Sequence, residues 1–352
     1  MAILRQHVFL YLCSVKEYRI IRPEGCAGFA GALECVLKQI ADFAENARNQ
    51  GGSLGFVRFY LSDAKNQEAQ LRAALRERLA DVAVSIVEQP PLDGSMISAL
   101  AIASDERQDI LFHSLRLSEE DAAGKSSYEQ ARLLFDRYLQ MLRPLGLNLA
   151  THCVRTWIYV RDIDSNYAGL VKARNDVFDE EGLSFHTHYI ASTGIGGATC
   201  APSALVAIDF LTYPALHESD KTYLKALSHL SPTHDYGVAF ERGVKLSDGH
   251  IFISGTASID HRGQILHEGD VLKQTDRLLE NIAALLREAG AEGSDPEVLE
   301  RVPYFLVYLR NPSDYEAVSA YMEQRFPDTP HILLHAPVCR PGWLIEMECD
   351  LG

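Results

Sequence analysis

The fold of this chain is decided by three stretches that share one pattern: Phe56-Val-Arg-Phe-Tyr60-Leu-Ser-Asp63, Val154-Arg-Thr-Trp-Ile-Tyr159-Val-Arg-Asp162 and Tyr304-Phe-Leu-Val-Tyr308-Leu-Arg-Asn311. Each stretch is rich in β-branched and aromatic residues, as strands are, and places a tyrosine three residues before its final Asp or Asn. The copies recur at intervals of roughly 100 to 150 residues, which is too long for a solenoid repeat. Each copy therefore marks a unit of domain size.

Amphipathic helices are predicted on both sides of each stretch. Before it, apolar residues recur at helical spacing, which gives the helix one apolar face to lay on a sheet. These residues are Val36, Ile40, Phe43 and Ala47 in the first copy, Leu134, Tyr138 and Met141 in the second, and Leu278, Ile282 and Leu285 in the third. After it, a second helix is predicted to begin at Asp63, Asp162 or Asn311, since these residue types cap helix N-termini.

Each copy is predicted to open with a hairpin and to close on two strands. The closing strands are expected at 84–91 and 96–103, at 189–196 and 204–211, and at 332–339 and 343–349. The opening hairpins are expected at 7–13 with 18–21 in the first copy and at 236–243 with 250–259 in the third. The pattern thus predicts an α+β fold of three units, each a mixed sheet backed by two helices.

Composition and charge disfavour several classes of protein. Of the 352 residues, 47% are hydrophobic, enough for a globular core, yet no apolar run approaches the roughly 18 residues of a membrane helix. The N-terminal residues lack the basic and then apolar order of a signal peptide, so a cytoplasmic protein is expected. The formal net charge of −15 disfavours nucleic acid as a partner, because phosphate binding needs clustered Lys and Arg.

The cysteines and histidines form none of the usual ligand motifs. The seven cysteines, at positions 13, 26, 35, 153, 200, 339 and 349, include no CxxC pair and are odd in number. This pattern predicts reduced thiols rather than a disulfide framework or a zinc site. The histidines form no HExxH motif, and the glycine-rich stretch 192–197 lacks the lysine of a phosphate-binding loop, so neither a metal nor a cofactor is predicted.

The third copy closely resembles the Rid family, also called the YjgF family and formerly labelled endoribonuclease L-PSP. The matching stretches are 253–259, 268–274, 281–290 and 343–348. The resemblance covers 234–352 and, more weakly, 107–213 and 1–104, which leaves 214–233 as a connector with a short helix. Family members are compact units of the chorismate-mutase-like α+β type that assemble as homotrimers, with active clefts between neighbouring subunits. The resemblance implies that this one chain folds as an intramolecular pseudo-trimer.

The three clefts of such a pseudo-trimer are not expected to be equivalent. The water-organising carboxylate of the family falls on Glu346 in the third copy, but on Ser98 and Ala207 in the others. The resemblance therefore implies one preserved cleft, in the third copy. The arginine that grips the substrate in imine-hydrolysing members aligns with His331, Ser192 or roughly Val84, and without it a carboxylate loses a bidentate clamp.

A second resemblance, to the chorismatases, suggests the chemistry. Those Rid-related enzymes cleave the enolpyruvyl ether of chorismate, and they are similar to this chain in Cys339-Arg340-Pro-Gly-Trp-Leu-Ile-Glu346, Ser254-Gly-Thr-Ala-Ser258 and Val307-Tyr-Leu-Arg310. In that family a cysteine lies seven residues before the catalytic glutamate, as Cys339 does before Glu346. The resemblance implies a hydrolase or lyase that protonates an enol ether, or an enamine, of a small organic acid. The alternatives are an imine deaminase of the Rid type and a member that only binds small ligands.

The candidate site residues follow from these resemblances and from residue chemistry. Glu346, Cys339 and Thr256 are predicted to be catalytic, with Glu346 as the proton donor and Thr256 near the attacking water. The predicted substrate-binding residues are Arg310, Arg340, Tyr236, Phe240, Arg242, Trp343 and His331. Each has a plainer explanation as well: the arginines as partners of surface acids, the aromatics as core, Thr256 as part of a turn, and Cys339 as a small buried hydrophobe. The predicted partner is a small-molecule substrate, and the chain is expected as a monomeric pseudo-trimer or a weak higher oligomer.

Overall fold

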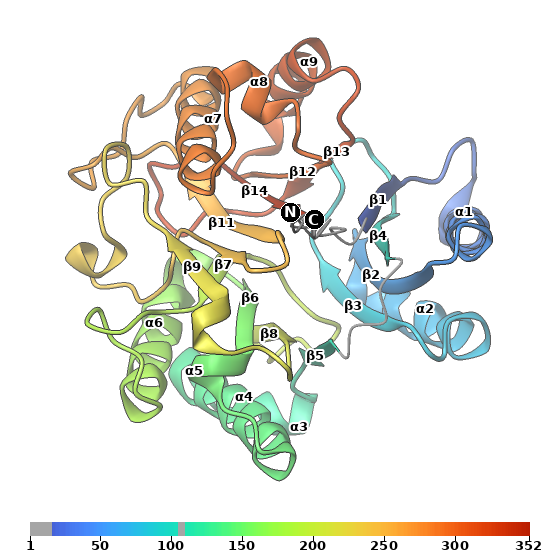
Figure 1. The fold of residues 1–352 in the computed structure, drawn as a ribbon. Coiled ribbons are helices and arrows are strands. Elements are labelled where there is room, and N and C mark those ends of the chain that lie inside the picture. The colour runs from blue at the N-terminus through green and yellow to red at the C-terminus, as the bar shows by residue number, and fades with distance from the viewer. Residues whose placement is uncertain (1–15, 105–109) are drawn as a thin grey trace, which may run out of the picture.

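The computed structural model describes residues 16–104 and 110–352, and three sheets surround a common centre (Figure 1). The first unit consists of β1 (Lys16–Ile21), α1 (Gly28–Asn49), β2 (Ser53–Leu61), α2 (Ala64–Arg78), β3 (Ala83–Glu88) and β4 (Ile97–Ser104). Its strand order is β1-β4-β2-β3, in which β3 runs parallel to β2 and the other neighbours are antiparallel. The helices lie on the outer side of the sheet (Figure 1).

The second and third units repeat this arrangement. The second contains β5 (Leu111–Leu115), α3 (Glu119–Ala122), α4 (Ser127–Leu142), α5 (Leu149–His152), β6 (Cys153–Val160), α6 (Ile163–Glu180), β7 (Ala191–Gly196) and β8 (Val206–Thr212). The third contains β9 (Lys221–Leu224), β10 (Gly243–Leu246), β11 (Ile251–Ala257), α7 (Val271–Glu288), α8 (Asp295–Leu299), β12 (Phe305–Leu309), α9 (Tyr315–Arg325), β13 (His331–His335) and β14 (Ile345–Leu351). The orders β5-β8-β6-β7 and β13-β12-β14-β11-β10-β9 place equivalent strands at equivalent positions, so the predicted fold of three α+β units is confirmed.

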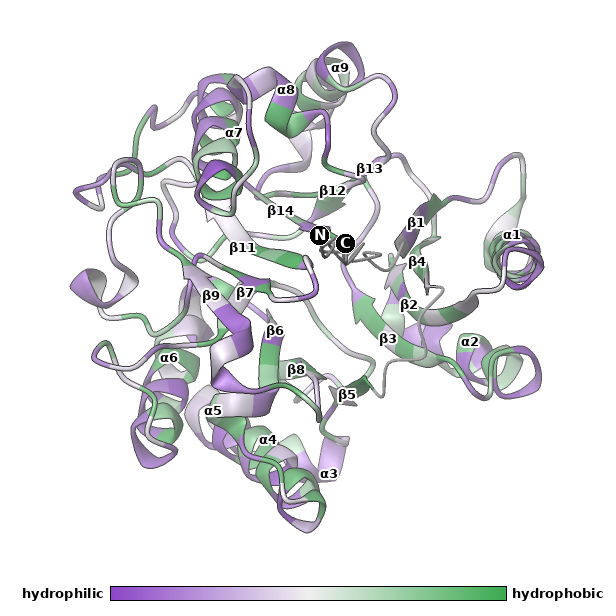
Figure 2. Ribbon diagram, viewed as in Figure 1, coloured by the Kyte–Doolittle hydropathy of each residue, from purple (hydrophilic) through white to green (hydrophobic). Residues whose placement is uncertain are grey.

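The outer helices are amphipathic, as their sequence spacing predicts. Val36, Ile40, Leu134, Leu278 and Ile282 are fully buried, and hydrophilic residues occupy the outward faces (Figure 2). Met141 is an exception, because it lies on the solvent side of α4 and is 42% exposed. None of the helices within 16–104 and 110–352 has the length and apolar character needed to cross a bilayer.

Strand register relates the three units residue by residue. Tyr60 lies opposite Ser98, Tyr159 opposite Ala207, and Tyr308 opposite Glu346. This register agrees with the sequence alignment that made Ser98 and Ala207 the counterparts of Glu346. At the ends of β3, β7 and β13 the units are joined by isolated bridges, Glu88 to Ala198, Pro91 to Leu334 and Ile195 to Val338.

The structure differs from the sequence prediction at the hairpin that opens the third unit. Residues 236–240 form no strand, because a 3-10 helix (Thr233–Tyr236) and a loop lead into β10. The partner of β10 on its outer side is β9, which falls inside the predicted connector and follows a 3-10 helix (Glu218–Asp220). In the first unit, β1 confirms the strand at 18–21, whereas its predicted partner at 7–13 lies outside the described residues. The domain boundaries themselves stay a prediction.

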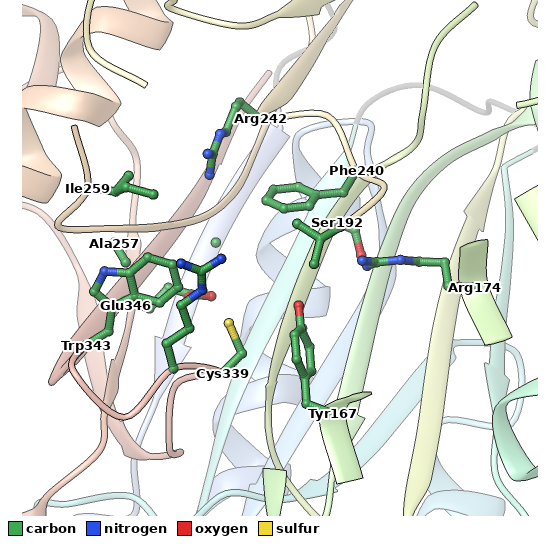
Figure 3. A pocket seen from close by; sticks show the side chains of 14 residues that line it. Tyr167, Arg174, Ser192, Phe240, Arg242, Ala257, Ile259, Cys339, Trp343 and Glu346 are labelled. Carbon is green, nitrogen blue, oxygen red and sulfur yellow. The ribbon is translucent and has the colours of Figure 1, made fainter. Parts of the chain in front are cut away.

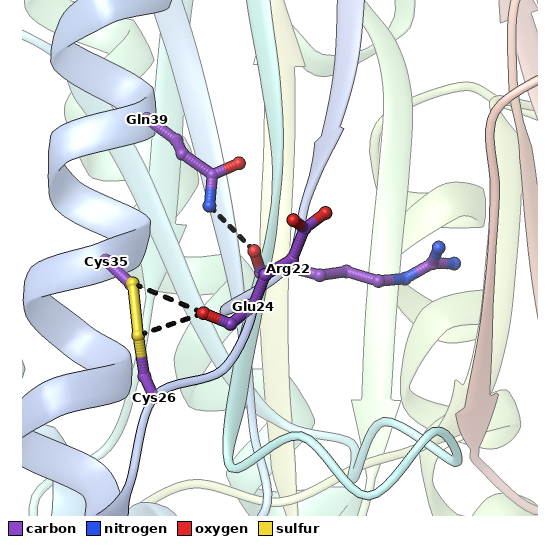
Figure 4. Close-up of a disulfide and its surroundings, with 5 residues drawn as sticks. All are labelled: Arg22, Glu24, Cys26, Cys35 and Gln39. Atoms are coloured by element: carbon purple, nitrogen blue, oxygen red, sulfur yellow. Dashed lines mark hydrogen bonds between the residues drawn. A yellow bond between two sulfur atoms is a disulfide. The ribbon is translucent and has the colours of Figure 1, made fainter.

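The prediction that every cysteine is a reduced thiol is wrong for Cys26 and Cys35, which form a disulfide (Figure 4). The segment before α1 turns back along the first turns of the helix, where Gly25 and Gly28 have φ values of 67° and 68°. Gln39 in the same helix donates a hydrogen bond to the Arg22 carbonyl (2.7 Å) and fixes this turn (Figure 4). The turn brings Cys26 close to Cys35 on the helix. Their spacing of nine residues matches no local cysteine motif, so the sequence did not indicate the pair.

Candidate active site

A pocket lies where the second and third units meet, and we call it the seam pocket (Figure 3). The third unit contributes Val238, Phe240, Arg242, Gly255, Ala257, Ile259, Cys339, Arg340, Trp343 and Glu346, and the second contributes Tyr167, Arg174, Ser192 and Gly194. Six of the ten predicted site residues are thus brought together in one place.

Glu346 lies on β14, between Ala257 of β11 and Tyr308 of β12. Its side chain is buried, with 5% of its surface exposed. Burial, and then the charge of Glu348, raise the pKa of the Glu346 carboxyl to about 8, although Arg242 and Arg155 oppose the shift. The carboxyl is therefore expected to carry a proton near neutral pH, as a general acid requires.

Gly255 on β11 makes room for this carboxyl. A Cβ at this position would overlap Glu346 Oε1 and would lie 3.0 Å from Thr193 Cγ2. Only a residue without a side chain therefore lets the carboxyl lie flat against the strand.

Replacing Gly255 with alanine is expected to reduce turnover by about 100-fold with a small loss of stability, because the Glu346 carboxyl has to turn away. Turnover and thermal unfolding of the purified variant check this. Gly55→Ala is the matched control, since a Cβ at that strand glycine meets its nearest neighbour at 3.9 Å. Equal turnover in the two variants would show that Gly255 has no part in placing the carboxyl.

The second unit contributes an arginine that the sequence analysis missed. Arg174 on α6 is only 1% exposed, and its Nε and Nη2 find no hydrogen-bond partner among the described residues. Its guanidinium points toward Ser192 at the edge of the pocket and lies 6.0 Å from the Phe240 ring (Figure 3). An unpaired buried charge is costly, so this geometry favours an anionic ligand. The available sequence signal was an arginine on the apolar face of α6, in line with Leu170 and Val177.

Aromatic rings and two further arginines form the rest of the pocket wall. Arg242 is buried, donates to the Ser231 carbonyl (3.0 Å) and lies 5.2 Å from the Phe240 ring. Trp343 is fixed by a hydrogen bond from its indole nitrogen to the Ser258 carbonyl (3.0 Å), and Arg340 lies over its ring at 5.1 Å. The pocket therefore combines a buried carboxyl, positive charge and aromatic walls.

The loop that carries Arg340 and Trp343 is held by α7. The side chain of Gln274 donates to the Gly342 carbonyl (2.9 Å) and accepts from the Leu344 amide (2.9 Å). On the next turns of the same helix, Asn281 donates to the carbonyls of Ala257 and Ile259 (3.1 and 3.0 Å). The two amide side chains thus fix both β11 and the loop before β14 relative to Glu346.

Cys339 lines the seam pocket beside Tyr167 (Figure 3). Burial, and then the proximity of Glu346, raise the pKa of its thiol to about 12. The thiol is therefore expected to stay protonated, which disfavours a nucleophilic role because the thiolate is the reactive form. In this position Cys339 shapes the pocket next to the acid.

The other predicted site residues lie elsewhere or are not described. Thr256 is fully buried on the opposite face of β11 and donates to the Ser254 carbonyl (2.9 Å), so its hydroxyl does not line the pocket. Arg310 forms two hydrogen bonds with Asp164 (2.8 and 3.1 Å). His331 lies at the seam between the third and first units, beside Arg22 and Asp93. The side chain of Tyr236 lies outside the part that the structure describes.

No group of three or more His, Cys, Asp or Glu side chains in 16–104 and 110–352 is arranged to hold a metal ion. The comparisons with known proteins agree with the fold. The family model described as endoribonuclease L-PSP matches residues 230–350. A solved chorismatase structure matches with a TM-score of 0.67 at 21% identity, covering 96% of this chain and 99% of the chorismatase.

Two single-unit structures also match. A Rid family protein of unknown function from Yersinia pestis is 21% identical, with 38% of this chain and 98% of that chain covered and a TM-score of 0.31. A member of the YjgF family from Neisseria meningitidis is 23% identical, with 38% and 95% covered and a TM-score of 0.29.

The third unit therefore resembles the endoribonuclease L-PSP family in sequence. Its three units together have the fold of a chorismatase.

Proposed function

We propose that this chain is an enzyme that protonates and then hydrolyses an enol ether, or an enamine, of a small organic acid. The proposal rests on one observation above all: the buried Glu346 carboxyl, with a pKa raised to about 8, lies in a pocket lined by Arg174, Arg242 and Arg340. A carboxyl that keeps its proton near neutral pH is suited to general acid catalysis. Guanidinium groups are suited to binding the carboxylate of the substrate.

The reaction begins with proton transfer from Glu346 to the terminal carbon of the substrate double bond. The π electrons form the new C–H bond, which leaves positive charge shared between the adjacent carbon and the ether oxygen or the amine nitrogen. Water adds to that carbon and returns a proton to the Glu346 carboxylate. The hydroxyl of the adduct then loses its proton and forms the carbonyl, while the C–O or C–N bond breaks and the leaving oxygen or nitrogen gains a proton, which releases a keto acid together with an alcohol or ammonia.

The residues around Glu346 have separate tasks in this scheme. Arg174 holds the substrate carboxylate, because its buried guanidinium has hydrogen-bond donors without partners in the described structure. Arg242 stabilises the negative charge that Glu346 acquires after proton transfer, consistent with its lowering effect on the pKa of Glu346. Trp343 and Phe240 exclude bulk water from the double bond.

Only the seam between the second and third units is proposed to carry this chemistry. In the first and second units the position of Glu346 is occupied by Ser98 and Ala207. Neither side chain can donate a proton to carbon near neutral pH. A homotrimer has three identical clefts by symmetry, whereas a fused chain is free of that constraint.

Incubating the purified protein with chorismate and with 2-iminobutyrate, and measuring pyruvate and ammonia, tests the proposal. Pyruvate from chorismate supports enol ether hydrolysis, and ammonia from 2-iminobutyrate supports the deaminase alternative. Tight binding of such acids without turnover would overturn the catalytic proposal in favour of a binding protein.

The rate of turnover is expected to fall as the pH rises through about 8, by about tenfold per pH unit above it. The sign follows from the role of Glu346, since only its protonated form donates the proton. Measuring kcat between pH 6 and 10 checks this. A profile that stays flat or rises across this range would exclude Glu346 as the acid.

A further inference from the structure

Glu348 is the next residue on the same face of β14 as Glu346, and it points into the centre where the three units meet. It is 2% exposed and accepts hydrogen bonds from Arg155 Nη2 (2.8 Å), Trp157 Nε1 (3.0 Å), the Tyr308 hydroxyl (2.9 Å) and the Thr193 hydroxyl. Arg58 of the first unit adds a longer ion pair at 3.8 Å. All three units therefore contribute to holding this one side chain.

A short chain of contacts connects Glu348 to the seam pocket. The Thr193 hydroxyl, which donates to Glu348, also accepts a hydrogen bond from the Gly255 amide (2.9 Å). Gly255 in turn is the residue whose missing side chain leaves room for the Glu346 carboxyl. The contacts run from β14 of the third unit through β7 of the second and back to β11 of the third.

We infer that Glu348 is a positioning residue for Glu346. It ties the strand that carries Glu346 to the second unit, and it places a second carboxyl group on the same face of β14, two residues away. This inference rests on the proposed function for its catalytic meaning. It extends that function, because it names the residue through which contacts from all three units position the Glu346 carboxyl.

The charges around Glu346 agree with this role. After burial, the Glu348 carboxylate is the largest cause that raises the pKa of Glu346, ahead of the opposing effects of Arg242 and Arg155. The titratable and charged groups that surround Glu346 come from α6, β6, β12, β14 and the loops before β10 and β14: Tyr167, Arg174, Arg155, Tyr308, Glu348, Arg242, Cys339 and Arg340. Glu348 is the acidic member of this set. Without it, burial would still raise the pKa of Glu346, but the arginines would oppose that shift with no neighbouring acid to offset them.

The chain contains a matched control for Glu348. Asp209 faces Trp157 on the neighbouring strand, as Glu348 faces Leu306, so it is the second unit's counterpart. It is also fully buried and accepts from Ser85 (2.6 Å), Arg116 (2.9 Å) and Tyr159 (3.1 Å). Asp209 is therefore an equally embedded acid, but it does not contribute to the pKa of Glu346.

The test is to titrate Glu346 directly in protein labelled with ¹³C at the glutamate carboxyl carbons, identifying its signal by its loss in Glu346→Gln. Glu348→Gln is expected to lower the titration midpoint of Glu346 by about one pH unit or more, and to move the alkaline limb of the turnover profile by the same amount. Asp209→Asn is expected to leave the midpoint unchanged. Thr193→Val keeps the charge of Glu348, so it is expected to lower kcat with little change in the midpoint.

The single variant leaves Arg155 without its carboxylate partner, so Glu348→Gln combined with Arg155→Gln is the second variant, in which both members of that ion pair are neutral. Because Glu348 outweighs Arg155, the midpoint is still expected to fall in this double variant. An unchanged midpoint in either variant, or an equal shift in Asp209→Asn, would overturn the inference. Wild-type protein without turnover would instead remove the proposed function, and the titration would still decide the role of Glu348.

Discussion

Glu346→Gln is expected to lower kcat by about 10²–10⁴, the usual contribution of a general acid, while the protein stays folded. The glutamine side chain has nearly the same shape as the protonated carboxyl, but its amide has no proton acidic enough to transfer to carbon. Turnover of the purified variant measures this, together with circular dichroism and thermal unfolding.

The stability of this variant has a pH dependence of its own. The pKa of Glu346 rises from 4.5 to about 8 in the folded protein, so the folded state binds more protons than the unfolded state between these values. The wild type therefore loses stability as the pH rises through this window, and the glutamine variant does not. The variant is expected to become more stable relative to the wild type from pH 4.5 to about 8. A constant difference in melting temperature would mean that Glu346 is not protonated in the fold.

Ser98→Ala is the matched control for Glu346→Gln. Ser98 occupies the equivalent position on β4, opposite Tyr60, and is also buried. It is expected to leave turnover unchanged, since the first unit lacks the acid. A loss of activity in Ser98→Ala comparable with that in Glu346→Gln would contradict the proposal of a single active seam.

Arg174→Met is expected to abolish the binding of small organic acids and to raise, or leave unchanged, the melting temperature of the ligand-free protein. The first effect follows because truncating one partner of a buried charged contact costs roughly 2–5 kcal/mol of binding free energy. The second follows because methionine replaces a buried guanidinium whose Nε and Nη2 have no partner among the described residues. Isothermal titration with the acids that bind the wild type, and thermal unfolding without ligand, measure the two effects.

Arg310→Met is the contrasting variant for Arg174. Arg310 is paired with Asp164 and also donates to the carbonyls of Trp343 (3.2 Å) and Val338, so its loss is expected to reduce stability and to weaken acid binding less than the loss of Arg174 does. If Arg310→Met abolishes binding and Arg174→Met does not, the assignment of the carboxylate-binding role to Arg174 is wrong.

Local sequence pattern was sufficient for the three units and for the equivalent strand positions of Glu346, Ser98 and Ala207. The strand, helix and tyrosine pattern predicted β2, β6 and β12 with their flanking helices, and the alignment of Glu346 with Ser98 and Ala207 matches the observed register. The same reasoning misplaced Thr256, which lies between two pocket residues in sequence but points to the other face of β11, and Arg310, which follows β12 and pairs with Asp164. The Cys26–Cys35 disulfide was missed because it depends on a turn before α1 that the spacing of the cysteines does not reveal.

The sequence by itself determined that the chain is a threefold repeat of an α+β unit, and that the third unit alone keeps a carboxyl at position 346. These features can be recognised from short-range periodicity and from the alignment of one copy with another. Only the tertiary structure decided that Arg174, Tyr167 and Ser192 of the second unit complete the pocket, and that Glu348 is held by residues of all three units. The physical reason is that burial, pKa and ion pairing depend on which side chains meet across the seam, and no local pattern records contacts between residues so distant in the chain.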